Sequence, residues 1–201
     1  MTGDSRLRIG SILWVSAVQF FAAQVVVTAA WPTPFDLTQR NISELGNTIS
    51  SPWHVLMNAS FLTIGITMAA GGLLTTTAFV RGFRRSAAVG LFGLAGAGVI
   101  LVGLYPENEA SAPHLAGAGL NFIAGNTALL LFGLALPGRR HLLRAFSLAA
   151  GLSGLAGTLL FAAGLDFGLG RGFMERVAVY PMPIWQMAAG YTFIRAPLTT
   201  R

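Results

Sequence analysis

The chain has 201 residues, of which 54% are hydrophobic and only 10% are charged, and it contains no cysteine. This composition excludes a soluble globular domain and indicates a polytopic membrane protein, while the lack of cysteine excludes disulfides and thiolate metal sites. Although the net charge is +6, every basic residue is an arginine in a short cluster between apolar runs. We therefore expect these arginines to set membrane orientation, and we expect no nucleic-acid partner.

Six apolar runs are long enough to cross a bilayer. They comprise residues 9–31, 53–80, 86–105, 114–136, 145–165 and 177–194. We expect a single domain over residues 1–201, an all-α integral membrane protein that folds as a six-helix transmembrane bundle. The first run is longer than the roughly 7–15 apolar residues of a signal peptide, so we interpret it as an uncleaved span.

Charges alternate between the two sides that six spans define. The side of both termini carries the arginine clusters Arg6 and Arg8, Arg81 to Arg85, Arg139 to Arg144, and Arg195 to Arg201. The positive-inside rule makes this side the cytoplasm. The opposite side receives six of the seven acids. A composition rich in Ala, Gly and Arg is typical of a GC-rich bacterial source, so we expect a multi-pass protein of the bacterial cytoplasmic membrane.

The longest polar segment, residues 36–47, forms the first outer loop. Asp36 can cap a short helix and Gly46 can end it, so we expect a helical turn at the membrane surface. Two spans, residues 86–105 and 145–165, have small residues every three to four positions, a pattern of close helix packing in lipid. We expect both to be buried in the bundle.

Glu44 is the first candidate for acid/base chemistry in this loop, with Ser43 and Asn47 beside it as candidate substrate ligands. Partial desolvation would raise the pKa of the Glu44 carboxyl toward neutrality. The alternative is a loop carboxylate paired with Arg40 or Arg176, since ion pairs are common where loops pack together. The residue types leave both interpretations open.

Glu107 and His114 form a second candidate catalytic pair, because only a short loop that begins Tyr105-Pro-Glu-Asn108 separates them. They could act as an acid/base pair or as two ligands of a divalent metal. No spacing resembles a zinc motif such as His-Glu-x-x-His, and no cofactor motif is present, so we expect neither a metal nor a cofactor.

Further polar residues near the outer ends of the spans are candidate substrate ligands: His54, Asn58, Asn108, Asp166, Arg176 and Trp185. Polar groups at this depth are costly unless paired or wet, so we expect an outward-facing polar cavity. Arg176 would clamp an anion there, or instead snorkel as an interfacial arginine. Pro181 and Pro183 predict an irregular start of the last span.

Three motifs carry a family resemblance: Asn41-Ile-Ser-Glu-Leu-Gly46, Tyr105-Pro-Glu-Asn108 with His114, and Gly172-Phe-Met-Glu-Arg176 with Trp185. In them the chain resembles the bacterial and archaeal membrane-protein family known as domain of unknown function 998. The resemblance covers nearly the whole chain and implies six helices. It also implies a Ser-(Asp/Glu)-Leu-Gly signature in the first outer loop and a Pro-x-Asn followed by His near the fourth helix. It implies no established activity.

Two classes of function fit these features. One is an enzyme or binding protein for a lipid or isoprenoid-type substrate, with Glu44 or Glu107 and His114 as acid/base groups and Arg176 holding an anionic head group. The other is a non-catalytic scaffold, accessory subunit or sensor, in which the same residues satisfy one another. Both are favoured over a small transporter, because the middle and cytoplasmic halves of the spans contain no charged residue. Membrane lipids are the expected partners, and the sequence leaves the oligomeric state open.

Overall fold

The computed structural model describes residues 2–195, and those residues form helices and connecting loops. In chain order the α-helices are α1 (Gly3–Val15), α2 (Val18–Ala29), α3 (His54–Phe79), α4 (Gly82–Leu104), α5 (Ser111–Ala135), α6 (His141–Ala162), α7 (Arg171–Val179) and α8 (Pro181–Arg195). Two short 3-10 helices, η1 (Ser43–Gly46) and η2 (Gly138–Arg140), lie in the loops. The predicted all-helical bundle is confirmed.

Five helical stretches are long and apolar enough to cross a membrane: Gly3–Ala29, His54–Ala78, Gly82–Leu104, Ser111–Ala135 and Gly138–Ala162. The sixth predicted span, residues 177–194, corresponds to the end of α7 and to α8, and the chain is a multi-pass membrane protein. Each predicted span ends within a few residues of the C-terminal end of the corresponding helix.

The first and last spans are each broken into two helices. The α1–α2 break lies at Ser16, whose hydroxyl donates to the Leu13 carbonyl at 2.6 Å. The α7–α8 break lies at Tyr180, directly before Pro181 begins α8. Proline lacks the N–H that would continue the helical ladder, so it separates the two helices. The predicted irregularity at this position is confirmed.

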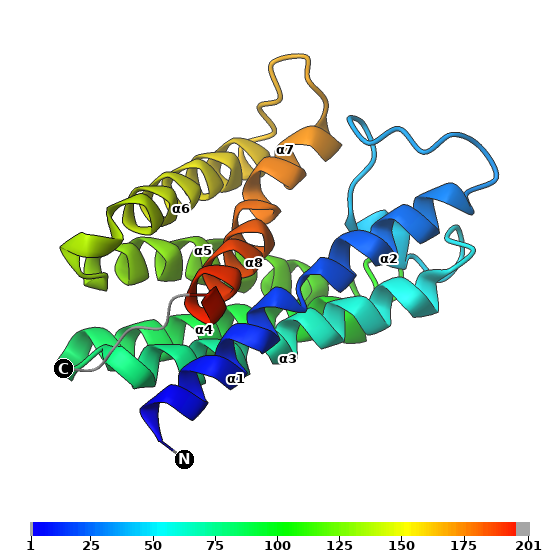
Figure 1. Cartoon of the computed structure of the whole chain (residues 1–201). Coiled ribbons are helices and arrows are strands. Elements are labelled where there is room, and N and C mark those ends of the chain that lie inside the picture. Colours follow the sequence, from blue (N-terminus) through cyan, green and yellow to red (C-terminus); the bar gives the residue numbers. More distant parts are fainter. Residues whose placement is uncertain (1, 196–201) are drawn as a thin grey trace.

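The helices pack largely in chain order. Helix α3 packs on α1 and α4, α4 packs on α5, α5 on α6 and α6 on α7, while α8 packs back on α1 and closes the bundle (Figure 1). At two crossings the backbones approach closely through paired glycines, Gly65 with Gly96 and Gly98 with Gly117. Small residues are the usual means of helix contact where lipid removes the hydrophobic driving force.

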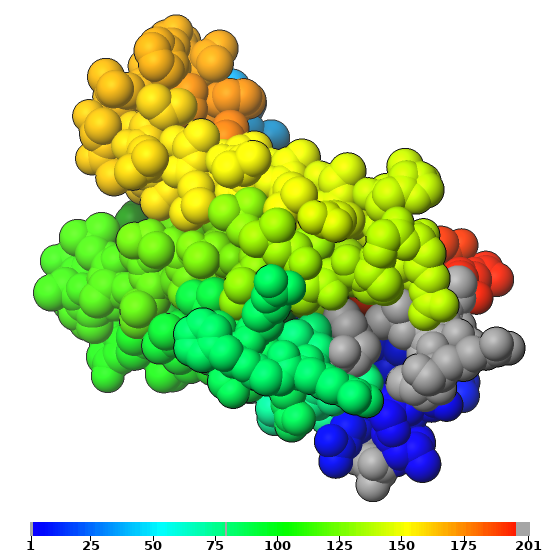
Figure 2. Space-filling view, turned by 90° about the vertical axis from the view of Figure 1, so that its left-hand side faces the viewer, coloured from blue at the N-terminus to red at the C-terminus, as the bar shows by residue number. Residues whose placement is uncertain are grey.

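The prediction that residues 145–165 form a buried span is wrong. Only 33% of the apolar window of α6 is buried, against 50% for α3. Figure 2 shows α6, in yellow-green to yellow, on the outside of the bundle, with the start of α7 in orange at its upper end. The small residues of α6 therefore serve contacts along one side of that helix, and its other side faces outward.

Loops gather at the two ends of the bundle (Figure 1). One end holds residues 30–53, 105–110 and 163–170, and the other holds the start of α1, the α3–α4 and α5–α6 turns and the end of α8. We name the first the loop end and the second the arginine end. That the arginine end faces the cytoplasm stays a prediction from the positive-inside rule.

Candidate functional site

Helix α7 and the first loop are joined at the loop end. The Phe173 N–H donates to the Thr38 carbonyl at 2.8 Å, and Arg176 Nη1 donates to the Arg40 carbonyl at 2.8 Å. A Cβ atom on Gly172 would collide with the backbone of Arg40, so only glycine permits this approach. The junction brings the side chain of Glu175 under residues 42 and 43.

Glu175 is the most completely buried carboxyl group of the described chain, with 4% of its surface exposed. Its Oε2 accepts a hydrogen bond from the Ile42 N–H, and its Oε1 lies 3.2 Å from Ser43 Oγ. Burial raises the pKa of this carboxyl to about 7, against the opposing effects of the Ile42 N–H, the Arg176 charge and the Ser43 hydroxyl. Glu175 precedes the predicted span 177–194, so it lies near the membrane boundary.

Ser43 connects Glu175 to His114. His114 Nε2 lies 3.0 Å from Ser43 Oγ, and His114 Nδ1 lies 2.8 Å from the Tyr105 carbonyl oxygen. Because that carbonyl can only accept, Nδ1 must carry a proton, and the hydrogen-bond network assigns the tautomer. The result is a continuous chain of polar atoms that runs from Glu175 through Ser43 and His114 to the backbone of Tyr105.

Two arrangements of protons fit this chain. In one, the Ser43 hydroxyl donates to an ionised Glu175 while Nε2–H of a protonated His114 donates to Ser43. In the other, a protonated Glu175 donates to Ser43, whose hydroxyl then donates to Nε2 of a neutral His114. Both contain the same number of protons, so shifting two of them along the chain interconverts an ion pair and a neutral pair. Such a chain can give or take a proton at Glu175.

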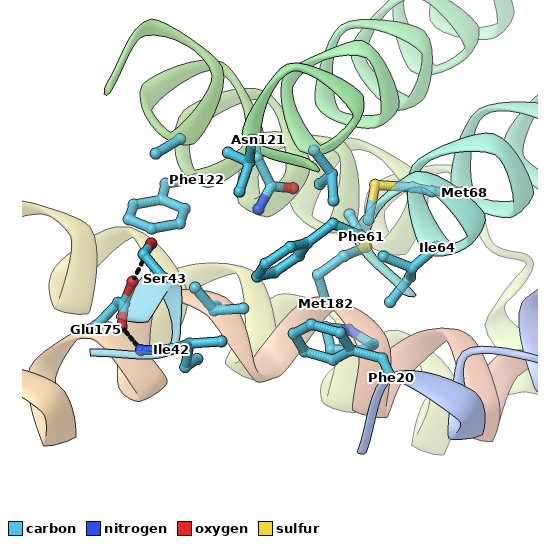
Figure 3. Close-up of a pocket in the computed structure, with 15 residues that line it drawn as sticks. Phe20, Ile42, Ser43, Phe61, Ile64, Met68, Asn121, Phe122, Glu175 and Met182 are labelled. Atoms are coloured by element: carbon cyan, nitrogen blue, oxygen red, sulfur yellow. Dashed lines mark hydrogen bonds between the residues drawn. The ribbon is translucent and has the colours of Figure 1, made fainter. Parts of the chain in front are cut away.

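The Glu175 end of this chain lies on the wall of an apolar cavity in the bundle interior. The cavity has a volume of ≈ 40 Å³, and its lining includes Phe20, Phe61, Met68, Phe122 and Met182. Figure 3 shows Glu175 and Ser43 together on one side of it, with Phe61 and Phe20 opposite. Asn121 adds a further polar group, and its buried Oδ1 has no hydrogen-bond partner. The site thus combines a titratable carboxyl with an apolar environment.

The two carboxyl groups predicted as catalytic lie on the loop side of this chain. Glu44 pairs with Arg40 at 2.8 Å and accepts the Asn41 N–H at 2.8 Å, which is the loop ion pair of the second interpretation. Burial raises the pKa of Glu107, the influence of His114 opposes this, and that of Glu44 adds to it. Glu107 therefore shares an electrostatic environment with His114, as the short loop between them predicts.

Three predicted ligands hold loops in place. Asn58 Nδ2 on α3 donates to the Gly46 carbonyl at 3.0 Å, and Asn108 Nδ2 donates to Thr48 Oγ1 at 3.0 Å. Asn47 Oδ1 accepts the N–H groups of Ile49 and Ser50, both at 3.0 Å. A Cβ on Gly46 would meet the Asn58 amide, which explains the glycine that ends η1. These contacts fix the first loop over the bundle.

The helical turn predicted for residues 36–47 is divided into two parts. Asp36 Oδ1 accepts from the Thr38 hydroxyl at 2.7 Å and from the Thr38 N–H at 2.8 Å, and the hydroxyl is the largest cause of a lowered Asp36 pKa. The chain then leaves this turn before η1 begins at Ser43. The division lets the Ile42 N–H point to Glu175 instead of into a helix.

The other three predicted site residues are not part of the Glu175 cluster. His54 begins α3, where its Nδ1 contacts the Ser51 carbonyl at 3.1 Å. Asp166 accepts the Gly168 N–H at 2.9 Å within the α6–α7 loop. Trp185 is 0% exposed, and its Nε1 donates to Ser147 Oγ at 2.7 Å in an aromatic core. No single cavity therefore collects the whole predicted set.

Within the described residues, 2–195, no group of three or more His, Cys, Asp or Glu side chains is arranged to hold a metal ion. The chain matches the family described as protein of unknown function (DUF998) over residues 14–192. The chain belongs to the DUF998 family. No curated protein and no solved structure matches it significantly.

Glu175, the central carboxyl of this DUF998 protein, was not among the predicted site residues. A signal was present, since Glu175 stands directly before Arg176 and within one of the family motifs. The hydrogen-bond partners of Glu175 could not be predicted from the sequence, because Ile42 and Ser43 lie more than 130 residues away in the chain. The backbone carbonyl of Tyr105 gives no sequence signal at all.

Proposed function

We propose that this DUF998 protein binds or processes a lipid or isoprenoid-type substrate by acid/base chemistry at Glu175. The observation that supports this is the Glu175–Ser43–His114 chain on the wall of an apolar cavity. A carboxyl group with a pKa near 7 suits proton transfer at physiological pH, and the apolar wall suits a hydrocarbon substrate.

Each residue of the Glu175–Ser43–His114 hydrogen-bonded chain would have its own role in proton transfer. Glu175 gives or takes the proton, Ser43 relays it, and His114 stores it at Nε2 while the Tyr105 carbonyl fixes the ring. Glu107 lies close enough to His114 to influence the charge that this chain carries. A volume of ≈ 40 Å³ accommodates only a small part of a lipid, so the reacting group alone would enter the cavity.

The second candidate is a non-catalytic scaffold, accessory subunit or sensor. It is favoured by the contacts of Asn47, Asn58 and Asn108, which all hold loops in the folded chain. In this function Glu175 would serve to anchor the Ile42 N–H. In either case we place the protein in the bacterial cytoplasmic membrane with the loop end outward.

The experiment is lipid and isoprenoid mass spectrometry on a deletion strain, complemented with the wild type, Glu175→Gln or Glu44→Gln, each confirmed to accumulate in the membrane. Glutamine keeps the shape of the side chain and removes its proton exchange. We expect a lipid species to change on deletion and to be restored by the wild type and Glu44→Gln but not by Glu175→Gln. If Glu175→Gln restores every species, or if deletion changes none, the acid/base function is wrong and the scaffold stands.

A further inference from the structure

A groove runs between α6 and the α7–α8 pair, on the outside of the bundle. Its volume is ≈ 550 Å³, within the usual range for ligand sites. Phe146, Ala149 and Ser153 line it from α6, and Phe173, Tyr180 and Ile184 line it from α7 and α8. Nearly all of this lining is apolar, and one charged residue, Arg176, takes part in it.

Two donors of Arg176, Nε and Nη2, lack a hydrogen bond of good geometry within residues 2–195. Arg176 is only 7% exposed, and its Nη1 donates to the Arg40 and Gly172 carbonyls at 2.8 and 2.9 Å. Nε and Nη2 are both buried, Glu175 and Tyr180 lie close enough to interact with the guanidinium, and no carboxylate of residues 2–195 forms an ion pair with it. A buried arginine left in this way is costly, and an anion would relieve that cost.

The pair of free nitrogens specifies the kind of anion. Nε and Nη2 lie on the same edge of the guanidinium group, the edge that binds two oxygens of one phosphate or carboxylate side by side. With Nη1 already occupied by two carbonyls, the orientation of the group is fixed in advance. Arg176 therefore holds two oriented donors behind the wall of the groove, and an oxyanion reaches them when a groove side chain moves aside.

The dimensions of the groove specify the remainder of the ligand. From Phe173 to Ile184 the helical rise of 1.5 Å per residue gives a length of about 16 Å. The hydrocarbon core of one leaflet is about 15 Å deep, half of the bilayer core. With the phosphate at the loop end, beside Arg176, about 12 Å of this length remain toward Ile184, so the groove holds most of one acyl chain of that leaflet.

We propose that the groove between α6 and α7–α8 binds a phospholipid of the leaflet at the loop end, with its phosphate on Nε and Nη2 of Arg176 and one acyl chain along Phe146, Ala149 and Ser153. Partly exposed groove side chains such as Phe173 change rotamer to admit the phosphate, a motion of picoseconds to nanoseconds.

This site is distinct from the Glu175 site. Neighbouring residues on an α-helix point in directions about 100° apart, so Glu175 lines the interior cavity while Arg176 lines the outer groove. Lipid binding in the groove does not depend on acid/base chemistry. Because the Arg176 charge also acts on Glu175, the two proposals are separated by Ser153→Phe, which changes neither residue.

The test is native mass spectrometry of the full chain in detergent with three added probes. Phosphatidylglycerol supplies phosphate and chains, galactosyl diacylglycerol supplies chains alone, and inorganic phosphate supplies the anion alone. We expect retained phosphatidylglycerol on the wild type and at least about tenfold less of the galactolipid, as the loss of a two-pronged charged contact implies. Equal retention of the two lipids, or binding of inorganic phosphate only, would overturn the proposal.

Three variants locate the site. Ser153→Phe fills the groove from α6 and keeps the Arg176 charge, whereas Arg176→Gln removes that charge. Leu152→Phe is the control, since Leu152 is 61% exposed on the same helix and does not line the groove. We expect about tenfold weaker phosphatidylglycerol retention for the first two and less than twofold change for the control. If Ser153→Phe binds as well as Leu152→Phe, or if a second copy of the chain is retained in place of lipid, the groove is not a lipid site.

Discussion

At the loop end, directional hydrogen bonds join segments that are far apart in sequence, whereas in the interior the helices are joined by aromatic packing. Trp14, Phe132 and Trp185 come from α1, α5 and α8, and the Trp185 ring lies 4.9 Å from each of the other two rings. The loop end depends instead on single contacts such as that of Glu175 with Ile42. The aromatic interior should therefore be most sensitive to truncation of a side chain, and the loop end should be most sensitive to a change of charge.

The largest expected effect is therefore in the aromatic core. Trp185→Ala removes a fully buried ring that also stacks at 5.9 Å on Phe92, and it leaves Ser147 Oγ without its donor. We expect a loss of about 3–5 kcal/mol in the free energy of unfolding. Thermal unfolding in detergent, followed by circular dichroism, measures it. The control is Trp53→Ala, with 54% of Trp53 exposed, and similar losses for both would contradict the aromatic core as the main support.

The second effect tests the loop end through pH. Because the Glu175 pKa is raised from 4.5 to about 7 in the folded protein, the folded state binds more protons than the unfolded state between these values. The contribution of Glu175 to stability is therefore highest at low pH and falls as pH rises through about 7, by roughly 3 kcal/mol in total. Unfolding temperatures between about pH 5 and pH 8 measure this slope.

Glu175→Gln is the matched variant for this slope. Its amide copies the protonated carboxyl, so we expect most of the pH dependence to vanish and the variant to exceed the wild type in stability above pH 7. A smaller slope of the same sign should remain, because burial also raises the Glu107 pKa. An unchanged slope in Glu175→Gln would show that another group titrates, and the electrostatic account of the loop end would fail.

The same comparison explains what could be predicted from the sequence. Apolar runs of membrane-spanning length report helices directly, so all six spans and the break before Pro181 were found. The interior packing was not, because Trp185 reads equally well as an interfacial or a buried ring until its neighbours on α1 and α5 are known. The spacing of small residues also led to a wrong prediction for the burial of α6. Small residues allow close packing, but they do not indicate how many sides of the helix are covered by other helices.

The sequence predicted several residues of the candidate site but not how those residues are arranged. Ser43 and His114 lie in motifs and are in contact, but the hydrogen bond that joins them spans 71 residues. Glu44 was preferred over Glu175 because it stands in a polar loop. In that polar loop Glu44 forms an ion pair with Arg40, whereas the apolar surroundings of Glu175 raise the pKa of its carboxyl. Desolvation is the main cause of the raised Glu175 pKa, and it arises only in the folded chain.

A third effect concerns the junction between α7 and the first loop. Gly172→Ala forces a Cβ against the Arg40 backbone, so we expect a loss of about 1–3 kcal/mol and faster hydrogen exchange in residues 36–47. The control is Gly119→Ala, because a Cβ there meets nothing within 4 Å. In a helix interior that change should be neutral or stabilising by up to about 1 kcal/mol. If exchange in the loop is unaffected by Gly172→Ala, α7 does not hold the loop.

The smallest effect is expected at Glu44, the carboxyl that the sequence favoured. Its ion pair with Arg40 is partly exposed, at 27% and 31% of the two side chains, so solvent screens most of its energy. The Arg40 guanidinium also lies 4.5 Å from the Trp31 ring and keeps that contact without Glu44. Glu44→Gln should therefore cost less than about 1 kcal/mol, because a glutamine oxygen can still accept the Asn41 N–H. Thermal unfolding at low and high salt measures it, and a loss as large as that of Trp185→Ala would make Glu44, not Glu175, the carboxyl on which the loop end depends.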